Sequence, residues 1–217
     1  MTTQTIGRTS RAPSTIFGTT AIACFAYAVL ALLLMHVLRP DYTPVNHMVS
    51  DYAVGPYGWV MTTSFLAMSL GCLMLGLGLA RGGPSSVAAR LGTFLLGICS
   101  IGLVVSAIFP TDLDGAPSTR TGDIHTISFL VNVGCIMLAS VLLSVSFGSD
   151  SRWRPYQPTA VTLALLIVLA FVLQFLTLHR GMPYGLTNRL FVTLIYAWMF
   201  ATSIRLRALA RATSIRG

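Results

Sequence analysis

Six long apolar runs constrain the fold of this chain more than any other feature of its sequence. They cover roughly residues 17–38, 57–80, 91–109, 125–147, 159–178 and 190–204. Each run is close to the ~20 residues that a helix needs to cross the hydrocarbon core of a bilayer. Only 9% of the residues are charged, against about 25% in soluble domains. The sequence therefore predicts an all-α polytopic membrane protein with six transmembrane helices in one bundle.

The arginines predict how the chain is oriented in the membrane. All 14 basic residues are arginine, and the loops between the apolar runs are short. If the N-terminus is cytoplasmic, ten arginines lie on the cytoplasmic side and four lie outside, namely Arg39, Arg120, Arg180 and Arg189. This distribution follows the positive-inside rule. We therefore expect a multi-pass protein of the cell membrane with both termini in the cytoplasm.

The same reasoning predicts the domain organisation and the general partners. We expect a cytoplasmic tail at 1–16, a six-helix membrane domain at 17–207 and a second cytoplasmic tail at 208–217. The net charge of +8 is explained by a basic rim against anionic lipid headgroups. The expected partners are the lipid bilayer and a hydrophobic small molecule, and nucleic-acid binding is not needed to explain the charge.

Acidic residues and histidines gather on the opposite face from most arginines. Five of the six aspartates and all four histidines fall at or beyond the outer ends of the expected helices. They are Asp41, Asp51, Asp112, Asp114, Asp123, His36, His47, His125 and His179. The outer face thus holds nearly every group able to do acid–base or metal chemistry. The four cysteines lie one each in the first four runs without CxxC spacing, which favours buried free thiols.

The first outer loop, "RPDYTPVNHMVSDYAVGPYGW", has a pattern of its own. Between Pro44 and Pro56 its apolar residues recur at helical spacing, which predicts a short helix. The opposite face of that helix presents His47, Ser50 and Asp51, because residues four apart are neighbours on a helix. Such a helix either lies in the interface with its polar face in water or dips into the bundle.

The second outer loop, "FPTDLDGAPSTRTGDIH", concentrates candidate catalytic groups. Asp112 follows the C-terminal end of the third helix, which is a poor electrostatic place for an anion, and we expect a functional role for it. Asp123 opens the fourth helix, where it is either a plain N-cap or part of a site. His125 lies inside the fourth apolar run, and a histidine there needs a partner or a task.

The remaining candidates lie at the sixth helix and deeper in the bundle. Arg189 begins the sixth helix and either pairs with an outer aspartate or holds a phosphate or carboxylate of a ligand. Asn132 is the foremost polar group within the runs, with Gln174, Thr62, Thr63 and Ser64. Each of these either lines a pocket or makes an interhelical hydrogen bond.

Four stretches resemble a bacterial and archaeal six-helix family. They are "HMVSDYAVGPYGWVM", "FPTD" at the end of the third run, "GDIH" at the start of the fourth, and "GLTNRLFVTLIYAWMFATSIRLR". The family is catalogued as a domain of unknown function among integral membrane proteins. The resemblance covers about residues 17–207 and implies a six-helix architecture. It points to Ser50, Asp51, Asp112, His125 and Arg189 as the matching polar positions, and it implies no particular reaction.

A looser similarity connects the chain to the membrane hydrolase superfamily that contains alkaline ceramidases. Those proteins use serine, aspartate and several histidines around zinc. This chain departs from that pattern because it lacks a paired HxxxH near its C-terminus and has one span fewer. The departure weakens the expectation of a zinc hydrolase.

The leading hypothesis is a membrane enzyme whose polar site acts on a lipid-like or isoprenoid-like molecule at the extracytoplasmic face. The candidate catalytic residues are Asp51, Asp112, Asp123, His125 and His47, and the candidate substrate-binding residues are Ser50, Tyr52, Arg189, Asn132 and Arg180. The reaction is either headgroup hydrolysis or transfer, or a cyclisation started by a neutral carboxylic acid. The sequence requires no cofactor, although His47, His125 and a carboxylate would suit zinc or a similar ion.

Two other functions remain open. A non-catalytic membrane subunit or sensor would bind a partner through its outer loops, with the acidic residues merely solvated. A small-solute transporter is less favoured, because no charged residue falls in the middle of any apolar run, where transporters hold their coupling sites. An enzyme requires the outer acids and histidines to converge on an enclosed pocket.

Overall fold

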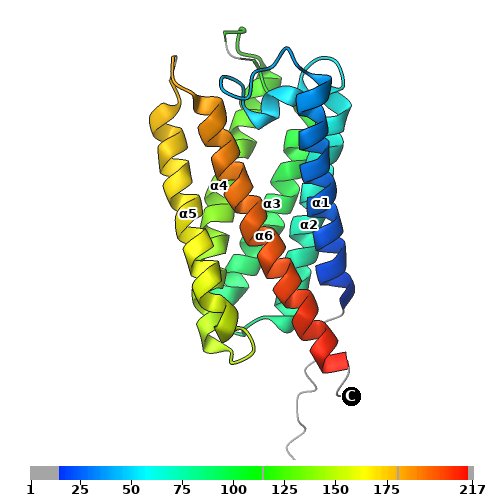
Figure 1. Ribbon diagram of the computed structural model, residues 1–217, viewed down its shortest axis with the longest axis vertical. Helices are drawn as coiled ribbons and strands as arrows, with labels where there is room; N and C mark the ends of the chain where they lie inside the picture. Colours follow the sequence, from blue (N-terminus) through cyan, green and yellow to red (C-terminus); the bar gives the residue numbers. More distant parts are fainter. Residues whose placement is uncertain (1–14, 114, 180, 215–217) are drawn as a thin grey trace, which may run out of the picture.

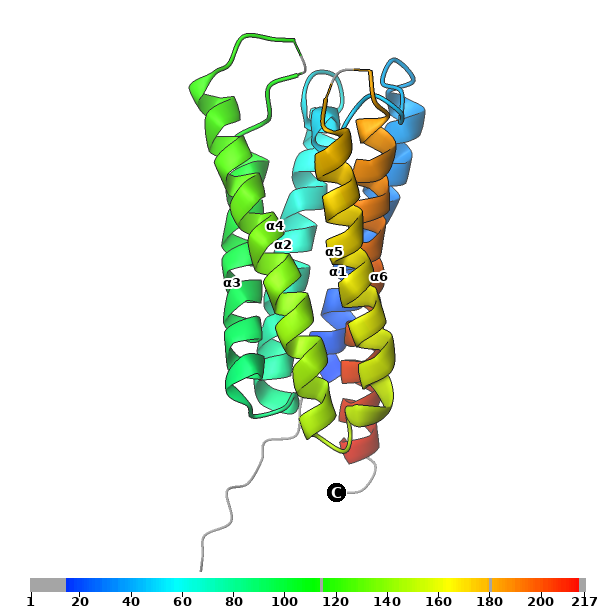
Figure 2. The same cartoon turned by 90° about the vertical axis from the view of Figure 1, so that its left-hand side faces the viewer.

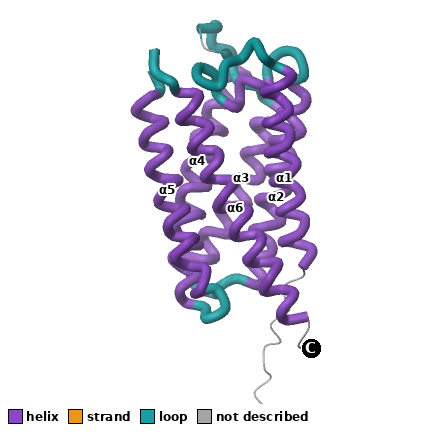
Figure 3. The backbone as a smooth tube through the Cα atoms, viewed as in Figure 1, coloured by secondary structure: helices purple, strands orange, loops and turns teal. Residues whose placement is uncertain are grey.

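The computed structural model describes residues 15–113, 115–179 and 181–214, and these residues form helices and loops without any strand (Figure 3). The six long helices are α1 (Thr15–Leu38), α2 (Gly58–Gly82), α3 (Val87–Ile108), α4 (Arg120–Ser146), α5 (Gln157–Thr177) and α6 (Tyr184–Ser214). All six are long and apolar enough to span a membrane. The expected all-α architecture with six membrane-spanning helices is therefore confirmed.

Three short 3₁₀ helices lie in the connections. They are η1 (Val49–Ala53), η2 (Phe147–Ser149) and η3 (Arg154–Tyr156). We call the end of the bundle that carries the loops 39–57, 109–119 and 178–183 the outer end, following the orientation that the arginines predict. The opposite end, with η2 and η3, is the inner end. Helices α1 and α6 begin and finish the described chain at the inner end (Figure 1).

The helices form a closed ring in chain order. Each packs against its neighbours in sequence, α6 also closes against α1, and α2 and α6 touch across the ring (Figure 1). The side chains that fill the ring are buried, among them Phe25, Leu75, Leu96, Leu143 and Trp198. Many large apolar side chains on the outside of the ring are exposed. This is the pattern of a bundle whose outer surface contacts lipid rather than water.

At the inner end, the connection between α4 and α5 packs against the end of α2. The indole of Trp153 stacks on Phe147 with ring centroids 4.5 Å apart, and its Nε1–H donates a 3.0 Å hydrogen bond to the Gly82 carbonyl. Asp150 pairs with Arg152 at 2.6 Å, and this arginine lowers the pKa of the Asp150 carboxyl. At the outer end, by contrast, α3 and α4 stand away from α5 and α6 (Figure 2).

Some boundaries differ from the apolar runs. Helix α6 continues to Ser214, although the last apolar run ends near residue 204. Leu206 and Ala210 are buried on this extension, so the apolar stripe of α6 continues past the end of the apolar run. Much of the predicted C-terminal tail is thus helical. Residues 1–14 and 215–217 of the predicted tails lie outside the described residues.

The four cysteines are free. Cys72 and Cys99 are buried, whereas Cys24 and Cys135 are half-buried. None of them is joined to another, which fits small apolar side chains in the helix packing.

Candidate functional site

The outer end of the bundle encloses a polar pocket of about 450 Å³. Its wall comes from the first outer loop, the end of α3, the first turns of α4, the end of α5 and the start of α6. The lining residues are Met48, Ser50, Asp51, Thr111, Asp112, His125, Thr126, Phe129, Leu130, Leu178, His179 and Tyr184. We call it the outer pocket. Its lining includes residues of α4 and of the segment after α5, and α4 and α5 stand apart at the outer end (Figure 2).

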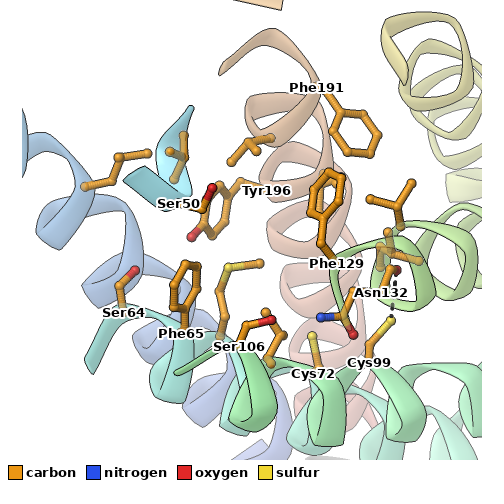
Figure 4. A pocket seen from close by; sticks show the side chains of 18 of the residues that line it. Ser50, Ser64, Phe65, Cys72, Cys99, Ser106, Phe129, Asn132, Phe191 and Tyr196 are labelled. Carbon is orange, nitrogen blue, oxygen red and sulfur yellow. Dashed lines mark hydrogen bonds between the residues drawn. The ribbon is translucent and has the colours of Figure 1, made fainter. Parts of the chain in front are cut away.

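A second, mostly apolar cavity of about 120 Å³ lies below the outer pocket, within the ring (Figure 4). We call it the inner cavity. Faces of α1, α2, α3, α4 and α6 line it, with Val49 and Ser50 of η1 at its outer end. Ser50, His125 and Phe129 line both spaces. The two spaces therefore adjoin, with the outer pocket above and the mostly apolar cavity below.

His125 is the central side chain at this junction. It is only 5% exposed, and its Nδ1 lies 2.7 Å from the carbonyl oxygen of Phe109, at the C-terminal end of α3. A carbonyl only accepts, so Nδ1 carries the proton in this contact and neutral His125 keeps Nε2 as an acceptor. The contact caps a free carbonyl of α3 and fixes the ring at the boundary between the outer pocket and the inner cavity.

Asp112 lies in the outer pocket and also holds the second outer loop. Its Oδ2 accepts a hydrogen bond from the backbone N–H of Thr119 and its Oδ1 accepts one from the Thr119 hydroxyl, both at 2.8 Å. A Cβ on Gly122 would overlap this carboxylate, so glycine permits the close approach. Both oxygens act as acceptors, which suits an ionised carboxylate.

Ser50 and Asp51 reach the pocket from η1. Asp51 is 7% exposed and its Oδ2 accepts a 2.8 Å hydrogen bond from the backbone N–H of Met48, at the start of η1. The η1 helix is anchored to α6 because the Val49 N–H donates a 2.9 Å bond to the buried Asn188 side chain. This anchoring holds Ser50 over the junction between the two spaces.

Arg189 makes no ion pair with an aspartate among the described residues, and it lines neither the outer pocket nor the inner cavity. Its NH1 donates to the carbonyls of Pro44 and His47 at 2.9 and 2.6 Å. Its Nε donates to His36 at 3.1 Å, and its NH2 donates to the hydroxyl of Tyr52 at 3.3 Å. The guanidinium therefore clamps the first outer loop onto α6, because the loop has free carbonyls that only a donor can satisfy.

Arg39 is a second clamp on the same loop. It is 5% exposed, pairs with Asp41 at 2.8 Å and donates a 2.6 Å bond to the Val54 carbonyl. The Arg39 guanidinium lowers the pKa of the Asp41 carboxyl. Arg39 and Arg189, two of the four arginines predicted to lie outside, thus both donate hydrogen bonds to backbone carbonyls of the first outer loop.

Three other candidates lie away from the pockets. His47 precedes η1 and stacks on Tyr42 with centroids 4.4 Å apart, so the expected helix carrying His47, Ser50 and Asp51 on one face does not form. Tyr52 is fully buried beside Arg189. Asp123 is exposed and accepts a 2.8 Å bond from Ser118. The N-cap of α4 is Thr119 rather than Asp123, because the helix begins before the apolar run.

Two sequence-predicted positions cannot be located. Arg180, a candidate for substrate binding, and Asp114 of the second outer loop lie outside the described residues.

The donor set proposed for a metal ion is not assembled. Within 15–113, 115–179 and 181–214 no three histidine, cysteine or acidic side chains converge on a common point. His47 lines neither pocket, while His125 lines both, which separates the two histidines of that set.

The inner cavity contains few polar side chains. Of the deeper candidates, Asn132 and Ser64 line it, whereas Thr62, Thr63 and Gln174 line neither space. Ser64 donates to the Ala28 carbonyl at 3.2 Å, which is an ordinary interhelical hydrogen bond. The amide oxygen of Asn132 is buried and has no hydrogen-bond partner in the described chain.

Part of the lining was not among the candidate site residues, although the sequence analysis counted His179 among the outer histidines. His179, Thr126 and Tyr184 face the outer pocket, and Asn188 and Phe129 face the inner cavity. A signal was available on α4, because His125, Phe129, Asn132, Val133 and Ile136 follow helical spacing from the polar site downward. The contributions from η1 and the end of α5 depend on how the ring closes, and no local pattern encodes that.

The fold and the site together define a class: a six-helix membrane protein with an outer pocket that adjoins a mostly apolar cavity within the helix ring. The chain belongs to a family described as "Protein of unknown function (DUF998)", whose profile matches residues 21–205. This match confirms the resemblance drawn from the short motifs. No curated protein and no solved structure matches the chain.

Proposed function

We propose that this protein is a membrane enzyme that binds an amphipathic, lipid-like molecule and cleaves or transfers its polar end. One observation carries the proposal: Ser50, His125 and Phe129 line both the outer pocket and the inner cavity. A molecule with a polar head and an apolar body fits such a pair of spaces. Its reacting bond would then lie beside His125.

The hydrogen bonds of the site favour a base over a strong acid. With Nδ1 bound to the Phe109 carbonyl, Nε2 of neutral His125 would take a proton from water or from a hydroxyl that attacks the headgroup. Asp112 uses both carboxylate oxygens as acceptors, and Asp51 accepts from the Met48 N–H. A cyclisation started by a neutral carboxylic acid needs a different environment, so we retain hydrolysis or transfer.

The position of the outer pocket also supports a substrate taken from the bilayer. Leu130 of α4 and Leu178 after α5 line the pocket and are 58% and 50% exposed. They lie on either side of the opening between α4 and α5. An apolar rim at this depth would admit a lipid chain sideways while its head stays near the interface.

The decisive test replaces His125 with asparagine. An amide nitrogen at this position can keep the hydrogen bond to the Phe109 carbonyl while Nε2 is lost, so the fold should survive. Proteoliposomes would be incubated with dodecyl-chain esters, amides and phosphate esters, and products would be followed by mass spectrometry. We expect His125→Asn to lower turnover about 10²- to 10⁴-fold.

Asp123→Asn is the matched control, because Asp123 is on the same helix turn but outside the pocket, and it should keep full activity. Turnover that survives His125→Asn would refute the base role. Saturable binding without any turnover across the panel would instead favour the non-catalytic sensor, since the pocket would then bind but not transform its ligand.

A further inference from the structure

The one unsatisfied amide of the inner cavity suggests what the ligand carries. Asn132 lies on α4 among apolar and sulfur-containing side chains, and its amide nitrogen points into the cavity (Figure 4). Its Oδ1 is buried and accepts no hydrogen bond from the residues that the structure describes. The Oδ1 lies against Gly102 of α3, so the amide nitrogen is the atom that a ligand in the cavity can reach (Figure 4). A buried amide without partners is costly, and the cost is greater where the bilayer excludes water.

The neighbouring polar groups of the cavity do not share this property. Ser64 donates to the Ala28 carbonyl. Ser106 and Ser128 are 3.1 Å apart, and Ser128 also donates to the Gly102 carbonyl. These hydroxyls already serve helix packing. Asn132 therefore stands apart as a group whose partner is missing.

The packing around Asn132 holds the amide in place. A Cβ on Gly102 would overlap the Asn132 amide, so the absence of a side chain at Gly102 is what lets the amide lie against α3. The backbone carbonyl of Asn132 accepts a contact from the Cys99 thiol at 3.5 Å. The amide is thus seated at a fixed depth in the cavity wall.

We propose that Asn132 is a specificity-determining residue that recognises a hydroxyl group on the apolar body of the ligand. A hydroxyl oxygen can accept a hydrogen bond from the Asn132 amide nitrogen, which points into the cavity (Figure 4). The inference rests on the proposed function, because it places the polar head of the same ligand beside His125. It goes further by naming the ligand class: a hydroxylated amphiphile.

The spacing on α4 sets where the hydroxyl lies. Asn132 follows His125 by seven residues, which corresponds to about 10.5 Å along a helix at 1.5 Å per residue. The inner cavity is narrow, and an apolar cavity of about 150 Å³ takes up a molecule the size of benzene. The chain segment beside Asn132 should therefore be short or medium in length, with its hydroxyl about two helical turns below the head.

The test is a competition between dodecanoate and its hydroxy isomers. Equimolar pairs would be offered to the full-length protein in nanodiscs, and the bound ratio would be read by native mass spectrometry after correction for partitioning into empty nanodiscs. In the wild type, one isomer with a mid-chain hydroxyl should be preferred over dodecanoate. Asn132→Leu should reduce that preference about 2- to 10-fold, as expected for one hydrogen bond.

Gln174→Leu is the matched control. Gln174 also has a buried amide oxygen without a partner in the described part of the chain, but it lines neither space, so its replacement should leave the ratio unchanged. Equal binding of all isomers to the wild type would overturn the inference even if Asn132→Leu does not fold. A preference that depends on Asn132 together with unchanged turnover in His125→Asn would sustain the inference and reject only the catalytic role.

Discussion

At the scale of single residues, Arg189 shows how a charge can be misassigned from sequence. An arginine at the outer mouth of a membrane bundle suggests a carboxylate or a ligand phosphate as its partner. Here the partners are the carbonyls of Pro44 and His47 and the side chains of His36 and Tyr52. A backbone carbonyl accepts a hydrogen bond from a guanidinium as any other oxygen acceptor does. The positions of these carbonyls depend on how the loop folds, and the sequence does not show that.

His36 is one of the hydrogen-bond acceptors of Arg189, and both of its ring nitrogens are used. Its Nδ1 lies 2.8 Å from the Leu32 carbonyl, which requires a proton on Nδ1, and its Nε2 then accepts from Arg189. The histidine is therefore neutral in this arrangement. Two of the four histidines of the outer end, His36 and His125, are oriented by a backbone carbonyl in the same way.

Replacing Arg189 should loosen the first outer loop. Arg189→Ala leaves the Pro44 and His47 carbonyls without their donor, and we expect a loss of about 1–3 kcal/mol of stability. Arg189→Lys should restore only part of it, because an ammonium cannot reach partners spread around a planar guanidinium. Thermal unfolding in detergent and hydrogen exchange of the loop would measure both effects.

Arg120→Ala provides the comparison, since Arg120 is another arginine of the outer end and its side chain is exposed. It should unfold at the wild-type temperature. Full rescue by lysine would mean that Arg189 contributes charge rather than geometry.

At the scale of elements, the first outer loop departs most from its pattern. Helical spacing between Pro44 and Pro56 predicted one short helix, whereas a turn at 43–47 precedes the 3₁₀ helix η1. Helices of this length have little stability of their own. The stacking of Tyr42 on His47 and the hydrogen bonds to Arg189 decide the conformation instead. Ser50 and Asp51 nevertheless line the outer pocket, because both lie on η1, which begins directly after Met48.

The same loop should be sensitive to acid. Arg39 lowers the pKa of Asp41, so the ionised pair contributes stability above the ordinary pKa of aspartate, about 3.9, and this contribution is lost as the pH falls through the lower pKa of the folded state. We expect hydrogen exchange in residues 39–57 to accelerate below about pH 4. Asp41→Asn should remove this pH dependence and exchange faster already at neutral pH.

The connection between α4 and α5, at the inner end, is the internal reference for the hydrogen-exchange measurement. Asp150 pairs with Arg152 and its pKa is also lowered, but this pair lies at the other end of the bundle. Asp41→Asn should leave its exchange unchanged. If Asp41→Asn changed the exchange of both ends at neutral pH, the substitution would act on global stability, which would contradict a local role for Asp41.

At the scale of the whole molecule, hydropathy was sufficient to predict the six spans, because a bilayer imposes helix length directly. The site was only partly predictable. Ser50, Asp51, Asp112 and His125 were chosen from sequence and do line the outer pocket, whereas His47, Asp123, Tyr52 and Arg189 do not. The closure of the helix ring and the hydrogen bonds of Arg39 and Arg189 to the first outer loop decide which of these side chains line the pocket. These are long-range contacts without a local sequence signal.

The orientation of the ring decides which leaflet supplies the ligand, and it can be tested directly. With the four native cysteines replaced, Ser118→Cys and Ser151→Cys place single exposed thiols at the outer and inner ends. A membrane-impermeant maleimide should label Ser118→Cys in intact cells and Ser151→Cys only after lysis, since ten arginines favour a cytoplasmic inner end. The reverse pattern would place the pocket at the cytoplasmic leaflet. Both proposals about the ligand would then apply to molecules of that leaflet. The two adjoining spaces and the position of Asn132 are properties of the helix ring, and they do not depend on how the ring is oriented in the membrane.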